Sequence, residues 1–289
     1  MIQRTRRAVL VGLALSCLAF VSLVPARAMA AEADYEALNR ALGIPELLVI
    51  MHDEGLSYGA DLGVEFLPDG GGASWAAVVA RIYDVPKMQV SVLTGLKTEL
   101  PPEHLPAILE FFRSERGKRI VAREILARRA FLDGATEEAA REAFRRAEAN
   151  AAAGEGDDQS VRLALLRSYI EANALVDFNV AGGLTASLRF YRGLVDGGAS
   201  EMSEEEMLAE VWSQEAEIRS DTGEWLMAYL MMAYDELSDE DIEAYVSLSK
   251  TEAGKALNRA LFAGFDAMYA DLSYALGLAV AMQMKGEDL

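Results

Sequence analysis

The chain has 289 residues, a formal net charge of −19, two histidines and one cysteine. Nucleic-acid binding depends on lysine and arginine neutralising phosphates, so this acidic balance excludes nucleic acid as an expected partner. One cysteine cannot close a disulfide within the chain, and His52 and His104 lack the spacing of metal ligands. We therefore expect no disulfide framework and no metal site.

Residues 1–30 are typical of an export signal. Three arginines precede an apolar run over residues 8–24, and Ala28 and Ala30 each end a small-x-small cleavage pattern. We predict cleavage after Ala28 or Ala30 and a periplasmic or secreted protein. An uncleaved membrane anchor is the alternative, although the run is shorter than the ~20 residues that usually span a bilayer. Residues Thr5–Leu10 also fit a twin-arginine signal, so the general secretory and twin-arginine routes both stay open.

Removal of this segment makes the protein more acidic. Residues 1–30 hold four of the 27 basic residues, none of the 46 acidic ones and the only cysteine, so the mature net charge is −23. We expect no stable membrane span after cleavage. The remaining chain is long enough for one large core or two modest ones.

Apolar residues then recur at helical spacing. A helix is predicted from Asp34 to Leu42, with Gly43 as its stop, and a long second helix runs to about Leu67. Glycines recur every four residues along one face of this second helix: Gly55, Gly59 and Gly63. Small residues at this spacing let another helix approach closely. We interpret the face as a packing surface within the chain, with a partner or ligand groove as the alternative.

One stretch of the sequence occurs twice. Leu100–Val121 and Leu237–Asn258 align without a gap at an offset of 137 residues. The similarity extends upstream at an offset of 127, where Asp69–Gly71 matches Asp196–Gly198. Downstream of these two turns, Ser74 and Ser203 are expected to cap matching helices, with Glu206 completing a capping box.

No strand pattern is present, so the predicted fold is all-α. We expect a tandem duplication of a helical-bundle unit, with unit 1 at residues 31–152 and unit 2 at residues 153–289. The glycine- and aspartate-rich stretch at residues 151–160 is the best linker between them. The apolar stretch Leu272–Met284 is expected to form a buried terminal helix.

The repeated stretch contains a helix break followed by a new helix. Ser114 and Thr251 are the expected N-caps of this new helix, each followed by glutamate. Glycine three residues into a helix costs about 1 kcal/mol relative to alanine. We therefore expect Gly117 and Gly254 to allow close approach of the preceding helix.

Lys118 and Lys255 are the polar pair that both copies share without an evident local benefit. A cation in the first turn of a helix opposes the helix dipole. One interpretation is that each ammonium group reaches back to the carbonyl groups that end the preceding helix. The other is an anion or partner contact.

The pattern Phe111, Phe112, Ser114, Gly117 and Lys118 resembles the family called domain of unknown function 2059. Members of that family commonly carry an aromatic pair, then serine, proline, any residue and glycine. This chain departs from the pattern because Glu115 and Glu252 replace the proline and Leu248–Ser249 replaces the second aromatic pair. The resemblance implies a mostly helical protein of the cell envelope, without an established activity and without catalytic residues.

The two copies differ in charge. Residues 96–134 hold eight basic and six acidic residues, whereas residues 233–271 hold three basic and nine acidic ones. Opposite charge is what complementary faces require, and homologous units commonly pair about a two-fold axis. We therefore predict that the copies dock as an internal pseudo-dimer. Arginines that pair along their own helix are the alternative.

The sequence contains no catalytic signature: no glycine-rich phosphate loop, no HExxH and no G-x-S-x-G. We predict a non-enzymatic protein without a cofactor. Two functions stay open. One is an interaction or scaffolding module that binds an envelope protein; the other is a carrier or chaperone-like protein that holds an apolar ligand between its helices.

Overall fold

The computed structural model describes residues 23–154 and 157–286, and every element in them is a helix. This confirms the predicted all-α class. The predicted signal peptide lies largely outside the described residues and stays a prediction. None of the described helices is both long and apolar enough to cross a membrane.

The described residues of the first half, 23–154, form seven α-helices and two 3-10 helices. Their bounds are α1 Leu23–Ala41, α2 Ile44–Phe66, η1 Pro68–Gly71, α3 Gly72–Ile82, α4 Val85–Glu99, η2 Pro102–His104, α5 Leu105–Arg113, α6 Glu115–Ala130 and α7 Gly134–Ala152. The second half contains α8 Asp157–Ala172, α9 Leu175–Asp196, α10 Glu204–Ser213, α11 Glu215–Ala233, α12 Asp239–Lys250 and α13 Glu252–Met284. The predicted break at Gly43 and the long helix after it are confirmed.

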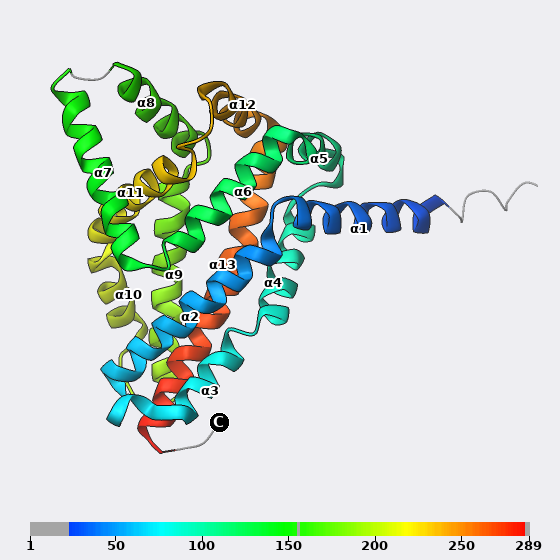
Figure 1. Cartoon of the computed structure of the whole chain (residues 1–289). Coiled ribbons are helices and arrows are strands. Elements are labelled where there is room, and N and C mark those ends of the chain that lie inside the picture. The colour runs from blue at the N-terminus through cyan, green and yellow to red at the C-terminus, as the bar shows by residue number, and fades with distance from the viewer. Residues whose placement is uncertain (1–22, 155–156, 287–289) are drawn as a thin grey trace, which may run out of the picture.

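The last helix, α13, runs through the middle of the molecule, with α9 on one side and α4 on the other (Figure 1). Glycine pairs allow both crossings. A Cβ atom at Gly95 of α4 would lie 2.4 Å from the Cα atom of Gly264, and one at Gly193 of α9 would lie 2.4 Å from the carbonyl oxygen of Tyr274. Real Cβ atoms do not approach other atoms so closely. These backbones can therefore touch only because glycine has no side chain at the crossing points.

Three of the four hydrophobic cores mix residues from both halves. One core joins α2, α3 and α4 to the C-terminal part of α13, and a second joins α6 and α7 to α8, α11 and α12. A third joins α1, α4, α5 and α6 to the N-terminal part of α13. Leu272, Leu276 and Val280 are all buried, so the expected burial of the terminal helix is confirmed.

The glycine face of α2 packs against α3. Cβ atoms at Gly55, Gly59 and Gly63 would clash with the side chains of Tyr83, Val79 and Trp75, and the Trp75 indole donates a hydrogen bond to the Gly59 carbonyl oxygen. The intramolecular interpretation of this face is therefore correct.

The expected cap at Ser74 is wrong. Helix α3 begins two residues earlier, at Gly72, because Asp69, Gly70 and Gly71 all adopt positive φ and complete the turn before Ser74 is reached. At the corresponding place in the second half, Ser203 and Glu206 form the predicted capping box at the start of α10.

Candidate functional site

The predicted N-caps are in place at both helix breaks. The Ser114 hydroxyl accepts a hydrogen bond from the Gly117 amide at 3.1 Å, and the Thr251 hydroxyl accepts one from the Gly254 amide at 3.0 Å. Each hydroxyl also donates to a carbonyl oxygen of the preceding helix. Both groups are occupied by backbone partners, which is a structural role.

Gly117 and Gly254 lie where the preceding helix comes closest. A Cβ atom at Gly117 would stand 2.2 Å from the Phe111 carbonyl oxygen, and one at Gly254 would stand 2.1 Å from that of Leu248. Any side chain at these two positions would clash with the preceding helix, so the chain can turn from one helix into the next only with glycine there. This close approach was predicted.

The interpretation of the two lysines needs correction. Lys118 pairs with Glu115 at 2.8 Å and Lys255 pairs with Glu252 at 3.4 Å, so neither reaches back to the preceding helix. A glutamate at the first helical position favours the dipole and lies three residues away, which is within reach of the ammonium group. Both lysine side chains are about half exposed, and nothing beyond these pairs supports an anion site.

Phe111 and Phe112 belong to the core between the halves. Phe112 is fully buried, and both rings contact Tyr245 of α12, at 5.6 Å for Phe111 and 5.9 Å for Phe112. The eight residues of the repeated motif therefore build helix junctions and join α5 to α12.

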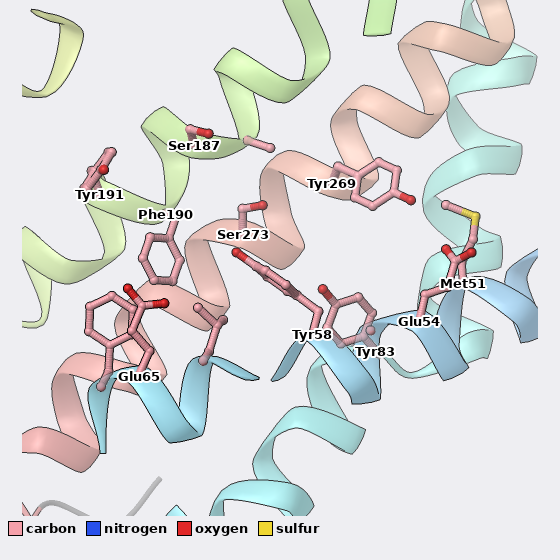
Figure 2. A pocket seen from close by; sticks show the side chains of 14 residues that line it. Met51, Glu54, Tyr58, Glu65, Tyr83, Ser187, Phe190, Tyr191, Tyr269 and Ser273 are labelled. Carbon is pink, nitrogen blue, oxygen red and sulfur yellow. The ribbon is translucent and has the colours of Figure 1, made fainter. Parts of the chain in front are cut away.

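The molecule instead opens at a groove between α2, α9 and α13, with a volume of about 440 Å³ (Figure 2). One face of α2 forms its floor, and residues from α9 and α13 form the opposite wall. Six of the lining side chains are aromatic: Tyr58, Phe66, Tyr83, Phe190, Tyr191 and Tyr269. The volume is in the range of small-molecule sites, roughly 300–1,000 Å³.

The tyrosine hydroxyls in this groove are free to bind. Within the described part of the chain, those of Tyr58, Tyr83, Tyr191 and Tyr269 form no hydrogen bond to another residue. Burial raises the pKa of Tyr269 to about 12 and also raises the pKa of Tyr58 and Tyr83. These phenols are therefore neutral at physiological pH and can donate or accept.

Two glutamates lie at opposite ends of the groove, with Glu65 beside Phe190 and Glu54 beside Met51 (Figure 2). Glu54 accepts a hydrogen bond from Arg128 at 2.7 Å. Burial is the largest influence on Glu54 and raises its pKa, although Arg128 opposes the shift. Glu65 is exposed and has no ion pair with any described residue.

Another apolar hollow lies on α9 and α10. Trp212 is 64% exposed and stands beside Leu208 and Leu184. Exposed tryptophan is enriched at the centres of protein interfaces. This hollow has the composition of a contact surface for another protein.

A buried carboxylate lies elsewhere, between α6 and α11. Glu124 accepts a hydrogen bond from the Tyr234 hydroxyl, and its own carbonyl oxygen accepts one from Tyr229 at 2.9 Å. Burial raises the pKa of Glu124 from 4.5 to about 7, and the Tyr234 hydrogen bond offsets part of the shift. Tyr169 and Tyr245, whose ring centroids are 4.7 Å apart, pack in the same hydrophobic core.

The comparisons give no relative from which a site could be transferred: no family model, no curated protein and no solved structure matches the chain. Within residues 23–154 and 157–286, no cluster of histidine, cysteine or carboxylate side chains could hold a metal ion. The aromatic groove is thus the best candidate site on geometry alone. Sequence reasoning missed it, because its residues come from α2, α9, α13 and the end of α3, and each has the spacing of an ordinary core position.

Proposed function

We propose that this is an exported, non-enzymatic protein of the cell envelope that holds a ligand with an apolar body between its helices. The observation that carries the proposal is the groove between α2, α9 and α13. It combines six aromatic rings with polar groups that have no partner among the described residues. Sites for small molecules usually have this composition, mostly apolar with a few polar groups that orient the ligand.

The scaffolding function is the second candidate. It is supported by the exposed hollow at Trp212 on α10, which would suit a protein partner. The two functions are compatible because the sites lie on different faces of α9. The groove is favoured because its volume is about 440 Å³, against about 320 Å³ for the hollow, and because six aromatic rings line it.

We also propose that the fold arose by tandem duplication and that its halves dock as an internal pseudo-dimer. Three features recur in the same order. A residue in the left-handed conformation, Gly43 or Ala174, precedes α2 and α9, and the hydroxyl caps and contact glycines recur at the starts of α6 and α13.

Ion pairs join arginines of the first half to carboxylates of the second, in agreement with the charge difference between the two copies. Asp241 of α12 is 6% exposed and accepts hydrogen bonds from Arg116 at 2.7 Å and Arg119 at 2.8 Å, both on α6. The two guanidinium groups, Arg119 first, lower the pKa of Asp241. Further along, α7 pairs with α11 through Arg141 and Asp221. These contacts support docking of the two halves through arginines of the first half and carboxylates of the second.

The resemblance to the domain of unknown function 2059 family is consistent with this proposal. It would place the protein in the envelope of a bacterium, as the export signal over residues 1–30 predicts. Neither inference adds a catalytic role.

Mass spectrometry of small molecules released from gently purified protein tests the binding function. We expect one class of molecule to co-purify with the wild-type protein. The groove-filling variant Ala186→Phe should lose it, while Ala60→Phe, on the exposed side of α2, should retain it. Equal amounts in all three proteins, or none in any, would rule out the groove as the site.

A further inference from the structure

The lining of the groove has an uneven charge. It contains two carboxylates, Glu54 and Glu65, and no lysine, arginine or histidine. Arg128 forms an ion pair with Glu54 at 2.7 Å, so Glu65 keeps the only uncompensated charge among the lining residues. An anionic ligand would meet a carboxylate without a counter-ion, which excludes fatty acids and phosphates as the expected occupants.

The aromatic rings at the Glu65 end of the groove favour binding of a cation. Tyr58, Phe190 and Tyr191 lie at the Glu65 end of the groove, and Phe66 packs on Phe190 with ring centroids 6.0 Å apart. The face of an aromatic ring carries negative potential and attracts an ammonium group within about 6 Å of the ring centroid. Tyr58 is 50% exposed, so its ring is accessible.

The remainder of the groove suits an uncharged body. From Glu65, Leu62 and Tyr58 lead along α2 towards Tyr83 and Met51, with Tyr269 opposite. Glu54 and Glu65 are 11 residues apart, which on one face of a helix corresponds to about 16 Å. The groove is therefore elongated, with a charged, aromatic end and a neutral, aromatic-apolar end.

We propose that the groove binds an organic cation, with its ammonium group at Glu65, Tyr58 and Phe190 and its carbon body extending towards Tyr269. This inference rests on the proposed binding function and specifies the class of ligand. The geometry assigns Glu65 as the counter-ion and Tyr58 as the ring that covers the cation.

Calorimetric titration with choline and with its neutral isostere 3,3-dimethylbutan-1-ol tests the charge directly, using protein freed of co-purified small molecules. The two probes have the same shape and differ in one atom, nitrogen or carbon. We expect choline to bind at least about tenfold more tightly than the isostere, since removal of the charge abolishes both the ion pair and the cation–π attraction.

Two variants locate the cation. Glu65→Gln should weaken choline binding by about fivefold, and Tyr58→Leu should weaken it to a similar extent, whereas binding of the isostere should change little. Asp61→Asn is the matched control, because Asp61 is an exposed carboxylate of the same helix that does not line the groove. All three positions are exposed on α2, and circular dichroism would verify that each variant is folded.

Equal affinity for choline and its isostere would overturn the cation inference while leaving the groove as a ligand site. Absence of choline binding would also overturn it, as would an Asp61→Asn effect as large as that of Glu65→Gln. Failure of the wider binding function is recognised separately, by the absence of any co-purified molecule that Ala186→Phe removes.

Discussion

Gly277 of α13 lies against the backbone of Phe190 of α9, and a Cβ atom at position 277 would stand 2.1 Å from the Phe190 carbonyl oxygen. Phe190 is also a lining residue of the groove. The closest contact in this helix crossing therefore holds one wall of the candidate site in place. The groove depends on the α9–α13 crossing, which only glycine allows.

From this contact we predict how a substitution at Gly277 changes the free energy of unfolding. Gly277→Ala should lower the free energy of unfolding by about 1–3 kcal/mol, because the added methyl group forces two backbones apart. Helix propensity alone would raise it by about 1 kcal/mol. Gly223→Ala on α11 is the control, since a Cβ atom there meets nothing within 4 Å, and it should be stabilising. The idea fails if chemical denaturation shows both variants to be stabilising.

The caps at the two helix breaks should contribute to the stability of the fold and not to ligand binding. Thr251→Ala should lower the free energy of unfolding by about 1 kcal/mol, because the Gly254 amide loses its acceptor. Thr251→Asp should retain most of the wild-type stability, since a carboxylate also accepts the hydrogen bond from the Gly254 amide and is favoured at the N-terminus of a helix. Loss of ligand binding in Thr251→Ala at an unchanged melting temperature would instead indicate a chemical role for the hydroxyl.

Glu124 should make stability depend on pH. Its pKa is raised on folding, so the folded protein binds more protons than the unfolded chain between pH 4.5 and about 7. Stability from this group is therefore complete below pH 4.5 and decreases as the pH rises towards 7, by about 1–3 kcal/mol. Glu124→Gln should lack this decrease. Parallel stability curves for the two proteins across this window would contradict the prediction.

Local features of the fold were predictable from sequence. Ser114, Thr251 and Ser203 were identified as caps because a hydroxyl side chain followed by glutamate satisfies the exposed amides of a helix start through short-range contacts. Ser74 also has a hydroxyl but is not followed by glutamate, and it caps no helix because Asp69, Gly70 and Gly71 adopt positive φ and α3 begins at Gly72. Lys118 pairs locally with Glu115, a contact that helical spacing alone could have predicted.

Long-range features were not predictable in this way. Gly95 and Gly264 meet at a helix crossing, but each is a single glycine in its own segment and carries no spacing signal. Tyr58 and Tyr269 share the groove although 211 residues separate them in sequence. A tyrosine at helical spacing looks the same whether it faces a core or a groove, so only the assembled helices distinguish the two.

The shared cores predict that the halves cannot act as independent domains. A protease site placed at residues 153–156 would allow the folded protein to be cut between α7 and α8. We expect the two fragments to stay together in gel filtration at both low and high salt, because buried apolar surface as well as ion pairs joins them. Fragments that separate and remain folded would show two independent domains on a linker.

The central claim is that a small molecule occupies the groove between α2 and α9. Hydrogen–deuterium exchange of wild-type protein, stripped of bound molecules and then supplied with the dialysable fraction of an envelope extract, tests it most directly. We predict slower exchange in Met51–Phe66 and Ala186–Tyr191, and no such change in Ala186→Phe. Unchanged exchange in both segments, or slower exchange confined to α10 around Trp212, would contradict it.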